Sequence, residues 1–581
     1  MKLDSSDSKN KEVNQKKTVK NVVYRIIFNN SELSILLLIT LISVVIRVYF
    51  SLKTWGMIQS NEVFQSLEIA HKLVYGYGTL YPEYQQENLL FPSFAQCKSY
   101  MFPLIFTIPM YIGKLFGWNY WNVTIPFIRV LLGINGALFT PSAYVLVKQY
   151  SKNKKYAIFA ALVVTVSPFL IFTSFRSLTN IFLVPWIFFI IASFWKTQEL
   201  LTNNFNKNSE YGFKILFLKF KDKKTFKAYI KITLLSTLLG LMIYIRLDII
   251  ISIIAIMLLK FPYRKKFATI ATGIGLFSAT IIGGLVDLVF YGKFLVSPIN
   301  WINFNFIEGN ASKMFGEQPF SYYFQLLASY DFVLLLISLC LLTLSIICAY
   351  AISNHKRSEI KKYHLVRVLG GFMLSTFFII LIFSFAKHKE FRFIYFGFIY
   401  LHISFALAVI IIVERAIPSI SNISYKICKK LKFLKTHLNP NRIKVFYVSL
   451  LVIGLCSGSV LVTIQATESL DWMVADEIAR GLAYVGQLED ATGVIVVIRW
   501  YNGDMYTYLH KNIPLKEFKD LGVYSEMEEL VMFLEENNQT YNYIILPSYQ
   551  IEATPTVVEI LSLYGYKTVH KIENRCQIYS N

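Results

Sequence analysis

Long apolar runs with few charges recur along this chain, and they constrain its fold more than any other feature. A transmembrane helix needs roughly 20 mostly apolar residues, and we interpret eleven of the runs as transmembrane helices. Of the 581 residues, 55% are hydrophobic and only 16% are charged, so the sequence predicts an all-α polytopic membrane protein. The eleven runs are 32–52, 124–147, 156–173, 179–195, 229–245, 247–262, 267–290, 331–352, 366–386, 393–413 and 444–466.

A further apolar run, 101–117, is short and contains Pro103, Pro109 and Lys114. We expect it to form a re-entrant or interfacial helix rather than a span. If it crossed the membrane, the loop 148–155 with its four lysines would face outward. That placement would contradict the preference of Lys and Arg for cytosolic loops.

The net charge of +22 comes largely from lysines in short loops between the apolar runs. Cytosolic loops carry this excess, so membrane orientation explains the charge and no nucleic-acid partner is predicted. The polar tail 1–31 and the basic loops are predicted to be cytosolic; these loops are 148–155, 196–227, 260–266, 355–362 and 426–444. The extracytoplasmic loops are then 53–123, 174–178, the turn around 246, 291–330 and 387–392.

Residues 467–581 differ in kind from the membrane domain 32–466. Strand-like runs such as Val494–Ile498 alternate with helical stretches, which is typical of a small α/β domain. No Gly-rich loop opens one of its helices, so no nucleotide site is predicted. We expect an extracytoplasmic accessory domain. The six cysteines of the chain show neither metal-ligand nor disulfide spacing, and no metal or other cofactor is predicted.

Charged and polar residues gather at the extracytoplasmic ends of the spans. The segment Lys387–Phe393 places five ionisable side chains at the mouth of a span, where they are costly to hold and indicate a functional site. In the first loop, Glu62, Gln65 and Glu68 fall on about one face of a helix. The other candidate site residues are Asn61, Glu83, Lys98, Tyr100, Arg176, Asn180, Arg246, Asp248, His388, Lys389, Glu390 and Arg392.

These residue types suit the transfer of a sugar from a polyprenyl-phosphate carrier. A carboxylate can take the proton of the acceptor hydroxyl as a base, and Arg, Lys or His can stabilise the charge on the departing phosphate. No metal or nucleotide is needed, because the lipid phosphate is itself the leaving group. Structural interpretations exist as well: Glu62 could cap a helix beside the membrane, and the arginines could contact lipid headgroups.

The order of these motifs resembles that of the dolichyl-phosphate-mannose-dependent mannosyltransferases of glycosyltransferase family 22, in the GT-C superfamily. The segment His388–Phe393 matches the family's His-Lys-Glu-x-Arg-Phe intact. Arg176–Asn180 is similar to its Arg-Thr-Leu-Thr-Asn motif. Further segments with similarity are Gln59–Glu68, Gly76–Tyr84, Lys98–Pro103 and Asp287–Asn305.

The resemblance implies an inverting enzyme that moves mannose from dolichyl or polyprenyl phosphate to a lipid-linked glycan acceptor, as in the assembly of GPI-anchor and N-glycan precursors. It implies the endoplasmic reticulum membrane in a eukaryote or the plasma membrane in a prokaryote. In this interpretation Glu62 is the base, and Asn61 and Glu68 line the acceptor. The donor phosphate is held by Arg246, His388, Lys389 and Arg392.

Three positions depart from the family pattern. Asn61 replaces a carboxylate and cannot accept a proton. That leaves Glu62 as the base, an unusual acceptor, or an inactive protein such as a non-catalytic subunit of a glycan-assembly complex. Lys98 replaces an arginine and loses its bidentate geometry, and Asp248 is an added carboxylate that could itself serve. A transporter or flippase for lipid-linked sugars is the other alternative. It predicts sites near the bilayer midplane and an internal repeat, and the sequence shows neither.

Overall fold

The computed structural model confirms a polytopic helical membrane protein. It describes residues 31–59, 61–88, 92–205, 223–260, 266–326, 364–411, 421, 424, 475–498, 505–519, 521, 524–572 and 575–581. Within these ranges seven helices are long and apolar enough to cross a membrane, and a bent pair makes an eighth if it is one span. The seven are Glu32–Lys53, Tyr120–Ser151, Thr179–Leu201, Lys224–Ile245, Ala268–Tyr291, Arg367–Ser384 and Phe391–Ile410.

These spans correspond to the elements α2 (Ser31–Lys53), η4 (Tyr120–Thr124) with α5 (Ile125–Ala137) and α6 (Phe139–Ser151), α9 (Thr179–Phe182) with α10 (Val184–Phe205), α12 (Lys223–Ile245), α14 (Lys266–Tyr291), α18 (His364–Ser384), and η8 (Phe391–Ile394) with α19 (Tyr395–Ile411). Two of the eleven predicted spans, 331–352 and 444–466, lie outside the described residues.

The predicted span 247–262 is shorter than expected in the described residues, which end there at Lys260. The chain still returns across the bundle there, because Tyr244 at the end of α12 donates to Asp287 Oδ2 at the end of α14 at 2.7 Å. The chain forms α13 (Ile249–Met257) and η5 (Leu258–Lys260) there, and together they are shorter than a membrane span. The reason is the turn at Arg246–Asp248, which ends α12 and delays the start of α13. The run 101–117 forms α4 (Met101–Leu115), which is also shorter than a span, as expected.

The bent pair consists of α7 (Lys154–Val166) and α8 (Pro168–Ser174), which meet at 71°. Pro168 has no backbone N–H, so the carbonyl of Val164 loses its helical donor. The buried Arg47 of α2 supplies the replacement: its Nη2 donates to the Val164 carbonyl at 2.8 Å, and its Nε donates to Ser174 Oγ at 2.8 Å. A guanidinium inside the bundle thus satisfies backbone that lipid could not.

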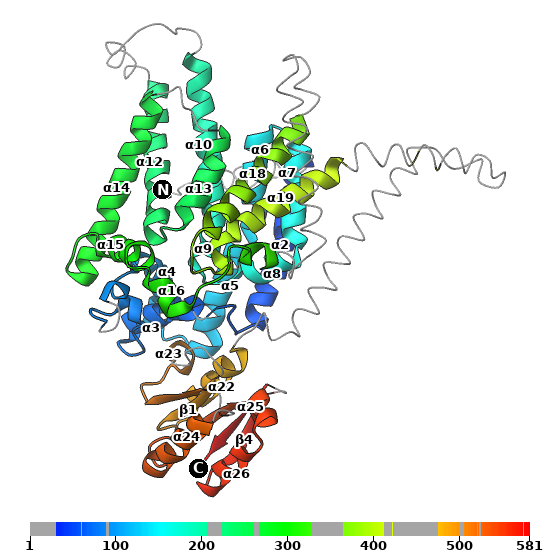
Figure 1. The fold of residues 1–581 in the computed structure, drawn as a ribbon. Coiled ribbons are helices and arrows are strands. Elements are labelled where there is room, and N and C mark those ends of the chain that lie inside the picture. The colour runs from blue at the N-terminus through cyan, green and yellow to red at the C-terminus, as the bar shows by residue number, and fades with distance from the viewer. Residues whose placement is uncertain are drawn as a thin grey trace, which may run out of the picture.

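The helices α12 and α14 pack closely against each other (Figure 1). Two glycines make this approach possible. A Cβ on Gly275 would lie 2.4 Å from the carbonyl oxygen of Thr233, and one on Gly240 would lie 2.6 Å from Ala279 Cβ. Small residues at helix contacts are the usual means of close packing in membranes, where no hydrophobic force drives helices together.

One end of the bundle carries most of the loop structure (Figure 1). The first loop forms η1 (Val63–Leu67), α3 (Glu68–Tyr75), η2 (Pro82–Tyr84) and η3 (Pro92–Phe94), and it leads into α4. The segment after α14 forms α15 (Val296–Ile302), η6 (Asn303–Ile307) and α16 (Asn310–Phe315). Asp287, near the end of α14, fixes the start of α15 because its Oδ2 accepts from Ser297 N at 2.8 Å and from Ser297 Oγ at 2.6 Å.

The C-terminal part is an α/β domain at the same end, as predicted (Figure 1). Its sheet has the order β2-β1-β3-β5-β4, in which β1 is parallel to β2 and β3, and β5 is antiparallel to β3 and β4. The strands are β1 (Val494–Ile498), β2 (Leu515–Lys519), β3 (Tyr543–Pro547), β4 (Lys567–Ile572) and β5 (Cys576–Ser580). The helices are α22 (Asp476–Gly486), α23 (Tyr506–Leu509), α24 (Tyr524–Asn537), α25 (Ser548–Ala553) and α26 (Thr556–Leu563).

Buried polar contacts join this domain to the first loop. The Asp476 carboxylate accepts from the backbone N–H of Trp55 at 2.5 Å and of Gly56 at 2.8 Å. Trp121 Nε1 donates to the carbonyl of Tyr508 at 2.9 Å. Apolar residues of α22, α23 and β1 share one core with the first loop and α4. The domain therefore covers the loop and completes its burial, while the boundary predicted at 466/467 lies outside the described residues.

Candidate active site

Glu62 lies in a closed, arginine-rich environment. Its Oε1 is 3.7 Å from Arg176 Nη1, and its Oε2 accepts from the backbone N–H of Ile58 at 3.0 Å. Burial raises the pKa of Glu62, and Arg176 opposes that shift. The enclosed space beside the pair is only about 10 Å³ and is also lined by Arg129 and Tyr508. Such a volume holds about one water molecule. The pocket lined by Lys98 and Arg246 has the same volume, so size alone does not distinguish the two groups of charges.

A second group of charges forms where three other segments meet. The Glu390 carboxylate is 2.6 Å from Arg392 Nε and 2.9 Å from His388 Nε2. Arg392 and His388 outweigh the effect of burial and lower the pKa of Glu390 to about 2. Arg246 Nε pairs with Asp248 Oδ1 at 2.9 Å. We call this group the cation cluster. It comprises Arg246, Asp248, His388, Glu390 and Arg392 together with the neighbouring Asn61, Glu83, Lys98 and Asn180.

Asn180 ties the segments of the cation cluster together. Its Nδ2 donates to Asp248 Oδ2 at 3.2 Å and to the backbone carbonyl of Arg392 at 2.9 Å. The short helix α9, the turn after α12 and η8 therefore converge, although they lie far apart in the sequence. This convergence is what the sequence predicted for Asn180, Arg246, Asp248 and Arg392, while their roles in a reaction stay predictions.

From the first loop, Asn61 and Glu83 reach the cation cluster. With its amide oxygen turned toward the guanidinium, Asn61 accepts from Arg392 Nη2 at 2.6 Å. Gln65 Nε2 donates to Glu83 Oε1 at 2.6 Å, whereas the buried Glu83 Oε2 has no hydrogen-bond partner among the described residues. Burial raises the pKa of Glu83, and the nearby Lys98 and Arg392 oppose that shift. Glu83 is therefore a carboxylate with one oxygen held and one available.

Lys98 supplies a further cation. It lines a small pocket with Arg246 and Ser99. Burial, with Arg246 as a second cause, lowers the pKa of Lys98 to about 8, while Glu83 opposes the shift. The ammonium makes no hydrogen bond to any residue within the described ranges. Two cations, one without a fixed partner, thus face the same small space.

Three other predicted site residues lie outside the cation cluster. Glu68 is fully buried and accepts from the backbone N–H of Thr507 at 2.8 Å and of Thr79 at 3.2 Å, so it joins the first loop to the C-terminal domain. Lys389 Nζ donates to the carbonyl of Gln318 at 2.7 Å and also to that of Ala386.

Tyr100 stacks on Phe290, with ring centroids 4.3 Å apart. It thereby packs the start of α4 against the end of α14.

Two residues near Glu62 were not among the candidates from the sequence. Arg129 lies within a predicted span, and its Nη2 donates to Tyr508 Oη of the C-terminal domain at 2.8 Å. A lone arginine inside an apolar run was a signal for it. The contact with Tyr508 had no local signal, because 379 positions separate the two residues.

The fold and this site define a polytopic membrane protein with a charged pocket at one end of its helix bundle. The chain belongs to the Alg9-like mannosyltransferase family, whose model matches residues 37–510. The resemblance to glycosyltransferase family 22 is thereby confirmed.

Among curated relatives, GPI alpha-1,2-mannosyltransferase 3 of Bos taurus is 23% identical over 346 residues, which are 58% of this chain and 52% of the relative. GPI mannosyltransferase 3 of Candida albicans is 25% identical over 347 residues, 60% of this chain and 58% of the relative. The chain thus spans little more than half the length of the curated relatives it matches.

Similar solved structures include ArnT from Cupriavidus metallidurans bound to undecaprenyl phosphate. Its TM-score is 0.49 and its identity 11%, and the match covers 94% of this chain and 97% of that one. The oligosaccharyltransferase of Archaeoglobus fulgidus has a TM-score of 0.48 at 12% identity, covering 94% of this chain and 73% of that one.

Proposed function

We propose that this chain is an inverting mannosyltransferase that moves mannose from a dolichyl or polyprenyl phosphate to a lipid-linked glycan. The observation that carries the proposal is the cation cluster, in which Glu83 and Asn61 of the first loop meet Lys98, Arg246 and Arg392. A carboxylate beside convergent cations is what a reaction with a hydroxyl nucleophile and a phosphate leaving group requires. Membership in a mannosyltransferase family supports the choice of sugar.

In this mechanism the cations hold the donor phosphate. Lys98 offers an ammonium with no hydrogen bond to the described residues, and Arg246 and Arg392 offer guanidinium N–H groups that are now paired with carboxylates. His388 lies beside Glu390 and completes the group. As the bond between the anomeric carbon and the phosphate oxygen breaks, the electrons stay on the phosphate, and nearby cations stabilise the added charge.

The attacking hydroxyl of the acceptor forms the new bond to the anomeric carbon and must lose its proton to a base. We infer that Glu83 is this base, because its Oε2 is unpaired among the described residues and burial raises its pKa. Glu62, the candidate from the sequence, is instead paired with Arg176, and its Oε2 accepts from the backbone N–H of Ile58. Glu68 and Lys389 then serve to hold the first loop and the loop before Glu390 in place.

The direct test uses the purified full chain in lipid nanodiscs. Radiolabelled dolichyl-phosphate mannose and a mannose-terminated glycolipid are supplied together, and we expect label in the glycolipid without added nucleotide. A transporter would move the donor across proteoliposome membranes without forming a product. A non-catalytic subunit would do neither, and either of these results would overturn the proposal.

We further propose that the cation cluster and the C-terminal domain face away from the cytosol, in the endoplasmic reticulum lumen of a eukaryote or outside the plasma membrane of a prokaryote. The basic loops support this orientation, because Lys and Arg prefer the cytosolic side of the membrane. Single cysteines at the exposed Lys387 and Glu529 should be labelled by a membrane-impermeant reagent from the same side. Labelling from opposite sides would contradict a single pocket on one face.

A further inference from the structure

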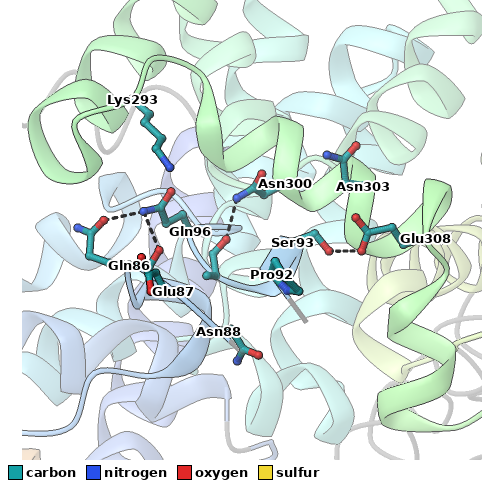
Figure 2. A pocket seen from close by; sticks show the side chains of 11 residues that line it. Gln86, Glu87, Asn88, Pro92, Ser93, Gln96, Lys293, Asn300, Asn303 and Glu308 are labelled. Atoms are coloured by element: carbon teal, nitrogen blue, oxygen red, sulfur yellow. Dashed lines mark hydrogen bonds between the residues drawn. The ribbon is translucent and has the colours of Figure 1, made fainter. Parts of the chain in front are cut away.

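A large cavity lies between the first loop and the segment after α14. Its volume is about 570 Å³, within the range of roughly 300–1,000 Å³ that is usual for ligand sites. Figure 2 shows Gln96, Lys293 and Asn300 directed toward the same space from different elements. The lining residues are Gln86, Glu87, Asn88, Pro92, Ser93, Ala95, Gln96, Lys293, Asn300, Asn303 and Glu308.

The lining has the chemistry of a site for hydroxyl groups. Five of its side chains are amides, which donate and accept hydrogen bonds at once, as sugar hydroxyls do. Two carboxylates, Glu87 and Glu308, outnumber the single cation Lys293. A pocket for an anionic lipid headgroup would need the opposite balance of charge.

Several lining groups are already fixed in place. Gln96 is buried and its Nε2 donates to Gln86 Oε1 at 2.6 Å, and Asn300 Nδ2 donates to the carbonyl of Ala95 at 2.8 Å (Figure 2). Ser93 Oγ donates to Glu308 Oε2 at 2.5 Å, which leaves Oε1 for another donor. A wall held by its own hydrogen bonds loses little entropy when it binds a ligand.

The cavity adjoins the small pocket that Lys98 and Arg246 share. One short segment of the first loop lines both spaces. Ala95 and Gln96 line the cavity, whereas Lys98 lines the pocket. On the opposite wall, Asn300 lines the cavity and the next residue, Trp301, lines the pocket. A ligand in the cavity would therefore lie beside the place proposed for the donor phosphate.

We propose that this cavity binds the glycan headgroup of the acceptor, with the sugar units next to the reacting one hydrogen-bonded to Gln96, Asn303 and Glu308. The inference rests on the proposed function and adds to it the place where the acceptor is recognised. Asn303 contributes an amide from η6. Its neighbour Asn305 is not among the lining residues, and its Nδ2 donates to the carbonyl of Trp301 at 2.8 Å. These two asparagines offer a matched pair of positions.

The experiment compares Asn303→Trp, which fills the cavity, with the control Asn305→Trp in the full chain. Transfer is measured at varied acceptor and at varied donor. We expect Asn303→Trp to raise the KM for the glycolipid acceptor at least about tenfold while the donor KM stays unchanged, and Asn305→Trp to change neither. Thermal melting confirms that both variants are folded, and Asn303→Ala gives the same test without added bulk.

A second measurement does not depend on transfer. Titration of the purified protein with soluble mannotriose is expected to show binding that Asn303→Trp abolishes and Asn305→Trp keeps. If transfer is absent but this binding pattern is found, the cavity assignment stands and the proposed reaction fails. If transfer is present but folded Asn303→Trp and Asn303→Ala leave the acceptor KM and mannotriose binding unchanged, the cavity assignment is overturned.

Discussion

At the scale of single residues, two neighbours in the first loop face different partners. Asn61 contacts Arg392 in the cation cluster, whereas Glu62 pairs with Arg176. Successive residues of a helix point about 100° apart, so one position along the chain decides which environment a side chain enters. The sequence places both residues at the right end of the bundle but does not say which carboxylate shares a space with the donor.

The choice of base can be tested by a pair of substitutions. We expect Glu83→Gln to lower kcat by about 10² to 10⁴ with little change in the donor KM, because the amide keeps the shape but cannot take a proton. Glu62→Gln should lower the melting temperature while kcat changes little, because the substitution leaves the buried Arg176 without its carboxylate. The measurements are steady-state transfer and thermal melting. The reverse pattern would make Glu62 the base.

Lys98 gives the donor site a pH dependence. The pKa of Lys98 is lowered to about 8, so its positive charge is present below that pH and lost as the pH rises through it. We expect kcat/KM for the donor to fall as the pH rises above about 8, because the ammonium no longer attracts the phosphate. Lys98→Arg should remove this step, since a guanidinium stays charged. A wild-type profile that is flat through this pH range would exclude Lys98 from donor binding.

At the scale of elements, hydropathy predicts helices well where a run is long and unbroken. It overestimates α13, because the polar turn at Arg246–Asp248 interrupts an apolar stretch and is itself part of the cation cluster. The bend between α7 and α8 is marked in the sequence by Pro168, but its partner Arg47 is not, because that contact spans 117 positions.

The contact between α12 and α14 yields a matched pair of glycine substitutions. Gly275→Ala places a methyl group against the Thr233 carbonyl, so we expect it to destabilise the protein by about 1–3 kcal/mol. At Gly273 nothing lies within 4 Å of an added Cβ, so Gly273→Ala should be neutral or slightly stabilising. Thermal melting in detergent compares the two. Equal melting temperatures would show that the helices can move apart freely.

At the scale of the whole molecule, the C-terminal domain is held on the first loop by a group of rings. His71 Nε2 and His510 Nδ1 are 2.9 Å apart, and His510 stacks on Tyr120 with ring centroids 3.5 Å apart. Burial lowers the pKa of His71 to about 3 and that of His510 to about 4. Both imidazoles are therefore neutral in the folded protein near neutral pH.

Protonation of His510 should weaken this interface in acid. A histidine with a lowered folded pKa contributes stability above its unfolded value near 6.5, and that stability is lost as the pH falls. Between about pH 7 and pH 5 we expect His510 to account for a loss of roughly 1–2 kcal/mol. Glu68, whose pKa burial raises to about 7, acts in the opposite direction because its stabilising effect grows as the pH falls.

Comparison of the wild type with His510→Gln separates the effect of His510 protonation on stability from that of Glu68, because both proteins keep Glu68. Melting temperatures are measured from pH 7 to pH 5 in each, and the wild type should lose more stability than the variant. Parallel curves would show that His510 does not resist protonation in the folded protein.

The sequence by itself determined the class of fold, the α/β character of the C-terminal domain and the family. These rest on properties of contiguous stretches: apolar length, strand-like alternation and motifs such as His388–Phe393. Only the tertiary structure decided that Glu83 shares the cation cluster while Glu62 faces Arg176, and that Glu68 holds the C-terminal domain. The physical reason is that these partners depend on how distant segments pack, which no local pattern encodes.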